Sequence, residues 1–185
     1  EASELYRIAQ IRIQTIEKFH EHIKTDAKEV PTIHNFLKKF PWLLDPRIMN
    51  FQDEVTYSNL LKENFGDDQK LEHDRRIDFL CQNFTESFFI IELKRPSKNI
   101  GEDELLQAID YVSFIKEKLD NENTKNVYCY IIGNKLVNTP KVRTLADSLS
   151  KSKSVYFKPY ESLLNAAHEY HREFIEKYDE IKKKQ

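Results

Sequence analysis

A chain of 185 residues is long enough to bury one sizeable core and short enough that a second core is not expected. Its formal net charge of -2 and sequence pI of about 6.4 exclude a globally basic nucleic-acid-binding protein but leave room for a local cationic face. No segment approaches the ~18 apolar residues of a membrane span, and no signal peptide is expected. The two cysteines lie in apolar runs without zinc-ligand spacing, so we expect reduced core thiols in a soluble, cytoplasmic protein.

The N-terminal part of the chain predicts two helices. Residues Ser3 to Lys24 contain neither Gly nor Pro and place apolar residues at three- and four-residue intervals, which is helical periodicity. A second helix is expected at about Pro31 to Lys39, before two further prolines interrupt it. We interpret residues 1–28 as a linker or packing helix and residues 29–185 as the main domain. Because the chain begins with Glu-Ala-Ser-Glu rather than Met, we expect an upstream domain in a longer protein.

Strands and helices then alternate toward the C-terminus. Strands are expected at about residues 51–57, in two apolar runs between residues 76 and 96, at 126–132 and at 155–159. Helices are expected at about residues 102–119, 139–150 and 161–184. The complete order is helix, helix, three strands, helix, strand, helix, strand and helix, which indicates one α/β domain.

The two apolar runs of the expected hairpin contain three charged residues, Asp78, Glu92 and Lys94. A turn centred near Thr85 places Asp78 opposite Glu92, about 5 Å away across the ladder. Strand side chains alternate between faces, so Glu92 and Lys94 share one face and the residue between them takes the other. Because an unpaired, buried carboxylate is costly, two acids in neighbouring buried strands suggest a compensating divalent metal.

The pattern Glu-x-Lys is weak by itself, since Glu180-Ile181-Lys182 also matches it in the polar end of the last expected helix. We interpret that second copy as solvated charge. The copy at Glu92 differs because four apolar residues precede it, Pro96 ends it and an acid on the preceding strand faces it. The setting, rather than the pattern, therefore indicates a site.

In this setting the chain resembles the PD-(D/E)XK nuclease superfamily, in which an acid on the second core strand and Glu-x-Lys on the third follow one helix and precede another. Asp78 in the segment RRIDFL matches the first acid, although Ile77 stands where the family often has proline. Glu92 and Lys94 in IIELKRP match the second part of the pattern.

The helix expected after the third strand carries a further match. Gln107 and Tyr111 in the segment QAIDY resemble the QxxxY motif found at this place in several branches of the superfamily. Residues at i and i+4 are neighbours on a helix, so both side chains could face the strand ends. An ordinary amphipathic helix would explain these two residues alone, but together with the hairpin they favour the resemblance.

The resemblance implies a restriction-endonuclease-like fold, a three-layer α-β-β-β-α-β core in which helices flank a mixed central sheet, here with an extra N-terminal helix. It implies a Mg²⁺-dependent DNA endonuclease that hydrolyses phosphodiester bonds, with Mn²⁺ able to substitute. Asp78, Glu92 and the main-chain carbonyl of Leu93 would hold the metal, since Mg²⁺ prefers oxygen ligands. Lys94 would orient or help deprotonate the attacking water, and Gln107 would hold that water or a phosphate oxygen. Tyr111 would support Gln107 or contact the strand backbone.

More narrowly, residues from about Glu29 to the C-terminus resemble the nuclease domain of the Shedu family of prokaryotic anti-phage defence proteins. The family's start is an acid before a helix that ends in Phe-Leu and a Pro-Trp-hydrophobic step, here Glu29 followed by FLKKFPWLL. This resemblance implies DNA as the substrate, a homo-oligomer, and Glu29 as an additional residue near the metal. An acid just before Pro31 would equally suit a helix N-terminus.

Four cationic residues near the expected site could contact DNA phosphates: Arg75, Arg76, Arg95 and Lys98. Each is equally compatible with solvated surface charge. Two alternatives to cleavage stay open at this point. One is a silent nuclease-like module that binds DNA ends, and the other is an assembly domain whose hairpin charges pair only with each other.

Two further features have ordinary structural interpretations. Trp42 is expected to anchor the core rather than to stack on a base. His168 and His171 are three residues apart on the last expected helix and could bind a metal, but we expect them to lie on a solvated face.

Overall fold

The computed structural model describes residues 2–45, 48, 50–56, 59, 75–82, 87–118 and 126–183. Its centre is a five-stranded mixed sheet with the strand order β1-β2-β3-β4-β5. Antiparallel neighbours make up the first part of the sheet: β1 (Asn50–Thr56), β2 (Arg76–Gln82) and β3 (Phe88–Leu93). Two strands then continue it parallel to β3: β4 (Val127–Gly133) and β5 (Val155–Pro159).

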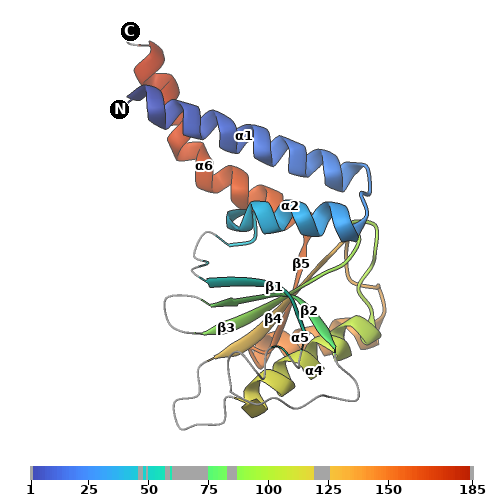
Figure 1. The fold of residues 1–185 in the computed structure, drawn as a ribbon. Coiled ribbons are helices and arrows are strands. Elements are labelled where there is room, and N and C mark those ends of the chain that lie inside the picture. Colours follow the sequence, from blue (N-terminus) through green and yellow to red (C-terminus); the bar gives the residue numbers. More distant parts are fainter. Residues whose placement is uncertain are drawn as a thin grey trace.

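Helices cover both faces of the sheet and make three layers (Figure 1). One face carries α4 (Glu102–Lys118) and α5 (Pro140–Lys151). The other carries α2 (His34–Lys39) and α6 (Tyr160–Lys183), with α1 (Ala2–Lys24) alongside α6. The predicted α-β-β-β-α-β order with an extra N-terminal helix is confirmed. Among the residues that the structure describes, no helix is both long and apolar enough to cross a membrane.

The second helical segment begins slightly earlier than predicted. A wide π-helical turn, η1 (Glu29–Ile33), precedes α2, with the Ile33 N–H donating to the Lys28 carbonyl at 3.1 Å. Pro31 fits this first turn because its missing N–H is not needed there. The predicted ends at Tyr57, Leu119 and Lys184, the polar loop before residue 71 and the hairpin turn at 83–86 lie outside the described residues.

Each face of the sheet has its own buried apolar cluster, as strand alternation requires. Toward α4, Leu80 and Ile90 pack with Leu105 and other residues of that helix. Toward α2 and α6, Phe79 and Ile91 pack with Leu37, Leu164 and with Phe19 of α1. The N-terminal helix therefore contributes directly to the core, and the charged residues of β2 and β3 lie between two apolar layers.

Both cysteines are buried free thiols, one in each cluster. Burial raises the pKa of the Cys81 thiol, and burial together with the charge of Glu92 raises that of Cys129. Both thiols are thus protonated packing residues at neutral pH.

Trp42 and His171 pack against each other. Trp42 is half-buried beside the α2 and α6 cluster, and its ring meets that of His171 edge to face at 5.1 Å between centroids. The prediction that His168 and His171 form a solvated face is wrong for His171, which is 3% exposed. The reason is that Trp42 packs on the ring of His171, whereas His168, about 60° away around the helix axis, stays exposed.

Gly133, at the C-terminal end of β4, packs closely against the segment that follows β3. A Cβ atom there would lie 2.7 Å from Ile100 Cδ1 and 3.1 Å from the Lys98 carbonyl oxygen. We expect Gly133→Ala to lower the free energy of unfolding by about 1–3 kcal/mol, because the overpacked backbone must shift. Urea denaturation measures this change. Gly101→Ala is the matched control, since its Cβ would meet nothing closer than 3.4 Å; an equal loss in both variants would contradict this explanation.

Candidate functional site

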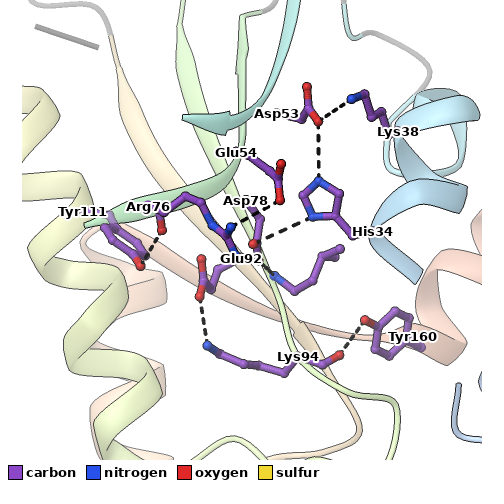
Figure 2. A network of polar contacts seen from close by, with 11 residues as sticks. His34, Lys38, Asp53, Glu54, Arg76, Asp78, Glu92, Lys94, Tyr111 and Tyr160 are labelled. Atoms are coloured by element: carbon purple, nitrogen blue, oxygen red, sulfur yellow. Dashed lines mark hydrogen bonds and ion pairs between the residues drawn. The ribbon is translucent and has the colours of Figure 1, made fainter. Parts of the chain in front are cut away.

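The charged residues of the hairpin lie where β2 and β3 separate (Figure 2). The β2–β3 ladder runs from the pair Gln82 and Phe88 to the pair Phe79 and Ile91, which confirms the predicted register of the two strands. One step further along this register, Asp78 stands opposite Glu92, as predicted. There the Leu93 N–H donates to Asp78 Oδ2 at 2.8 Å. The Asp78 carboxylate therefore bridges the two strands where their ladder ends.

Strand β2 loses its regular alternation at Asp78. Ile77 packs in the cluster beneath α4 whereas Phe79 packs in the opposite one, although residues two apart normally share a face. On the neighbouring strand β1, Glu54 has a left-handed φ of 49°, which is uncommon for a residue other than glycine. This distortion leaves Asp78 at the junction of the two faces, within reach of both α2 and β3.

Glu92, Lys94 and Gln107 form a hydrogen-bonded chain between β3 and α4. Lys94 Nζ donates to Glu92 Oε1 at 2.9 Å and to Gln107 Oε1 at 3.3 Å. Gln107 Nε2 donates to the Tyr111 hydroxyl at 2.8 Å, and that hydroxyl donates to the Arg76 carbonyl at 3.1 Å. Tyr111 thus holds Gln107 and also ties α4 to the beginning of β2.

The backbone of Lys94 is fixed from two sides. Its N–H donates to the Ile132 carbonyl at 2.8 Å, and its own carbonyl accepts from the Tyr160 hydroxyl at 2.6 Å. Tyr160 is the first residue of α6 and is buried. The sequence gives no signal for Tyr160, because its contact depends on where α6 packs.

The two acids are buried, and their electrostatic settings differ. Asp78 is 6% exposed and Glu92 is 5% exposed. Burial raises the pKa of Asp78, and this effect outweighs the lowering by the Leu93 N–H bond and by the charges of His34 and Lys94. Glu92, in contrast, has the Lys94 ammonium in direct contact. The site as a whole therefore favours an additional positive charge next to Asp78.

The donor chemistry of this site fits magnesium better than zinc. Asp78, Glu92 and the Leu93 carbonyl offer oxygen atoms, and Mg²⁺ prefers oxygen and keeps several waters, so two carboxylates are enough. Zinc sites use three or four protein ligands. Across the described ranges, no group of three or more His, Cys, Asp or Glu side chains could hold a metal.

Glu29 and His34 lie on the same helical segment, and only His34 is seen to reach Asp78. Glu29 begins η1, and its side chain lies outside what the structure describes, so its predicted role stays a prediction. His34 is 2% exposed, with Nδ1 3.9 Å from Asp78 Oδ1. Sequence reasoning missed His34, although a histidine between Ile33 and Leu37 on an apolar helix face was an available signal.

The four predicted DNA-contacting cations are all exposed, and each forms an ion pair with an acid of the protein. The pairs are Arg75–Asp110 at 2.6 Å, Arg76–Glu54 at 3.3 Å, Arg95–Asp26 at 3.0 Å and Lys98–Glu104 at 2.9 Å. Exposed ion pairs are worth at most about 1 kcal/mol, so a phosphate group can compete for these cations.

A shallow hollow opens beside Lys94. Its volume is ≈ 670 Å³, and its lining includes Arg95, Ser97, Lys98 and Asn99 from the loop after β3. Asp26 at the end of α1 holds this loop, since its Oδ1 accepts from the Ser97 N–H at 2.8 Å. The lining of the hollow thus includes Lys94 together with two of the exposed cations, Arg95 and Lys98.

Comparison with known proteins identifies no family. No protein-family model matches this chain, and no curated protein sequence matches it. Three solved structures share part of the fold: a repair endonuclease from Pyrococcus abyssi (16% identity, TM-score 0.43), EndoMS in complex with double-stranded DNA (12%, 0.43) and AF1548, a protein of unknown function (16%, 0.41). In each case the match covers 69% of this chain, and it covers 44%, 42% and 55% of the other chains, respectively. The chain thus spans about half the length of the structures it matches, and these likenesses assign it no activity.

Asp78→Asn is expected to stabilise the fold. Because the pKa of Asp78 is raised above 3.8 in the folded chain, its ionised form costs stability at neutral pH. An asparagine oxygen can still accept from the Leu93 N–H. In EDTA at pH 7.5 we expect the melting temperature to rise by roughly 2–4 °C for each 1 kcal/mol gained. The gain should shrink as the pH falls through the raised pKa and disappear below 3.8, where Asp78 is protonated in both the folded and the unfolded chain.

Asp147→Asn is the control for this measurement, since that acid on α5 is exposed and pairs with Lys151 one helical turn away. A lower melting temperature for Asp78→Asn at pH 7.5, with Asp147→Asn unchanged, would show that ionised Asp78 stabilises the fold.

Proposed function

We propose that this chain is a metal-dependent DNA endonuclease that hydrolyses phosphodiester bonds. The observation that carries the proposal is the meeting of two buried acids and a lysine at the separating ends of β2 and β3, with Lys94 Nζ 2.9 Å from Glu92 Oε1. A structural ion pair would explain Glu92 and Lys94. It would not explain an acid at Asp78, because burial raises the pKa of this carboxyl group and an asparagine oxygen could accept from the Leu93 N–H equally well.

In this proposal Asp78, Glu92 and the Leu93 carbonyl hold Mg²⁺, and Mn²⁺ can replace it. The bound ion supplies a Lewis acid that polarises the phosphodiester and acidifies water. Lys94 orients the attacking water as an ammonium or, as a neutral amine, takes its proton, and the resulting ammonium offsets charge on the phosphate. The contact of its carbonyl with Tyr160 fixes the backbone that carries this side chain.

Gln107 and Tyr111 position Lys94 in this scheme. Gln107 accepts from Lys94 Nζ through its oxygen and donates to Tyr111 through its nitrogen, so it holds the ammonium from α4. The predicted contact of Gln107 with water or a phosphate oxygen stays a prediction, because these two bonds use one of its two amide N–H groups and one lone pair of its oxygen. Tyr111 fixes the Gln107 amide in turn.

DNA is the substrate that the surroundings of the site favour. Exposed cations lie along the hollow beside Lys94, and Arg75 and Arg76 lie at the beginning of β2. Phosphate groups of a nucleic-acid backbone are the matching ligands. The resemblance of the segment from Glu29 through FLKKFPWLL to Shedu proteins extends the proposal to the effector domain of a cytoplasmic anti-phage defence protein.

An assembly role is the second candidate, and one observation favours it. Leu5, Ile8 and Ile11 of α1 are 51%, 47% and 51% exposed, which is high for large apolar side chains. Their three-residue spacing gives α1 an apolar stripe beside α6. The stripe supports the proposal that the chain forms a homo-oligomer, either as an active nuclease or as a silent DNA-binding module.

The nuclease proposal predicts that supercoiled and linear DNA are cut in Mg²⁺ and spared in EDTA. Lys94→Met and Asp78→Asn should each reduce the cleavage rate by about 100-fold or more, because each removes a group that acts in the transition state. Glu180→Gln, in the second Glu-x-Lys copy, and Lys151→Met on α5 are the matched controls and should cut normally. Circular dichroism checks the fold of all four. Unimpaired cutting by Lys94→Met would refute the assignment, whereas DNA binding without cutting in Mg²⁺ or Mn²⁺ would favour the silent module.

The DNA contacts predict a salt effect that needs no catalysis. The double variant Arg95→Gln/Lys98→Gln should bind DNA more weakly in EDTA, and the slope of log affinity against log salt should fall by about 2, since two phosphate contacts are lost. Fluorescence anisotropy with a labelled duplex measures both. The control is Lys141→Gln/Lys151→Gln on α5, where both side chains are at least 75% exposed. An unchanged slope in the first variant would remove these two cations from the DNA interface.

A further inference from the structure

His34 is a buried histidine whose ring nitrogens lie beyond hydrogen-bond distance of every described partner. The side chain is 2% exposed, and its ring packs on Phe79 with 4.4 Å between centroids. Within the described residues, neither Nδ1 nor Nε2 has a hydrogen-bond partner. A buried polar group that makes no hydrogen bond costs about 1–3 kcal/mol, so a leucine would be the cheaper residue for packing alone.

Each nitrogen of the ring instead faces a carboxylate (Figure 2). Nδ1 lies 3.9 Å from Asp78 Oδ1, and Nε2 lies 3.7 Å from Asp53 Oδ2. Both separations exceed a hydrogen bond by about 1 Å, so a small movement of either group would form one. The imidazole is thus placed between the candidate metal ligand on β2 and an acid on the edge strand β1.

The Asp53 end of this arrangement is anchored. Lys38, one helical turn after His34 on α2, lies 2.7 Å from Asp53 Oδ2. Burial acts to raise the pKa of Asp53, but the hydrogen bond and charge of Lys38, with the charge of His34, hold it below its ordinary value. Asp53 is therefore an ionised, fixed group behind the imidazole.

The Leu93 N–H alone does not fix the orientation of the Asp78 carboxylate. Its Oδ2 accepts from the Leu93 N–H at 2.8 Å, which fixes one oxygen, and the carboxylate could still rotate about that contact. The imidazole faces Oδ1 at 3.9 Å, where the hydrogen bond formed by a small movement would restrict this rotation. Replacing a residue that orients a metal ligand through a contact of this kind typically lowers metal affinity by about 10–100-fold.

We propose that His34 is a positioning residue that holds the Asp78 carboxylate in its metal-binding orientation, with Asp53 and Lys38 holding the imidazole from behind. The metal part of this proposal rests on the proposed nuclease function. The orientation of Asp78 does not, and it can be measured without metal.

Three substitutions separate the possible roles of the ring. His34→Asn keeps an amide nitrogen near the Nδ1 position, which faces Asp78. His34→Gln keeps one near the Nε2 position, which faces Asp53. His34→Leu keeps apolar volume and no donor. His20→Leu, at an exposed position of α1, is the control.

The first readout is the backbone amide signal of Leu93 in protein labelled with ¹⁵N-leucine and kept in EDTA. Because this N–H donates to Asp78, its chemical shift reports the position of the carboxylate. We expect His34→Leu and His34→Gln to move the signal and His34→Asn to keep it near that of the wild type. An unmoved signal in His34→Leu, or an equal displacement in all three variants, would overturn the positioning role.

The second readout is Mn²⁺ binding by calorimetry without DNA. His34→Leu and His34→Gln should bind Mn²⁺ about 10–100-fold more weakly than wild type, and His34→Asn should stay close to it. Equal affinity in all variants would overturn the proposal. A wild-type protein that binds no Mn²⁺ would overturn the nuclease function and the metal part of this inference, while the Leu93 signal would still decide whether His34 positions Asp78.

Discussion

The arrangement of the site depends on one hydrogen bond, from the Leu93 N–H to Asp78 Oδ2 at 2.8 Å. It closes the β2–β3 ladder with a side chain where a backbone carbonyl would otherwise accept, and so it brings a carboxylate between two strands. The cost is a buried charge, which the raised pKa of Asp78 records. The benefit is that the two strands can separate there without leaving the Leu93 N–H unsatisfied. Glu92 and Lys94 directly flank Leu93, so the same hydrogen bond places them at the end of the ladder.

Side chains from both helical layers contact the site at the end of the β2–β3 ladder. From the α4 layer, Gln107 contacts Lys94 and Tyr111 contacts the Arg76 carbonyl. From the α2 and α6 layer, His34 faces Asp78 and Tyr160 holds the Lys94 carbonyl. Strand ends are normally where such side chains can meet, because the two apolar clusters exclude polar groups further inside. The backbone and the charged side chains of the site are thus held from both layers.

Local patterns in the sequence were enough to predict the hairpin register and the helix of Gln107. Apolar runs symmetric about Thr85 allow one register that buries both strands, and a four-residue spacing on a helix fixes a shared face. The irregular features were not predictable in this way. The change of face between Ile77 and Phe79 depends on tertiary packing, and the contacts of His34 and Tyr160 join segments far apart in the chain. His171 was assigned to solvent for the same reason, since helical spacing does not show which neighbour covers a side chain.

The N-terminal helix has a closer connection to the site than its amphipathic pattern implies. Its Phe19 is fully buried in the core beside α6. Just after it, Asp26 adopts a left-handed φ of 49°, a conformation that aspartate tolerates better than most residues, and the chain turns back toward the sheet. In that position the Asp26 carboxylate accepts from the Ser97 N–H and forms an ion pair with Arg95. Arg95 and Ser97 belong to the loop that follows Lys94. The burial of Phe19 stabilises the helix against the core, and the helix in turn holds the turn at Asp26. The position of the loop beside Lys94 therefore depends on a segment that is remote from it in sequence.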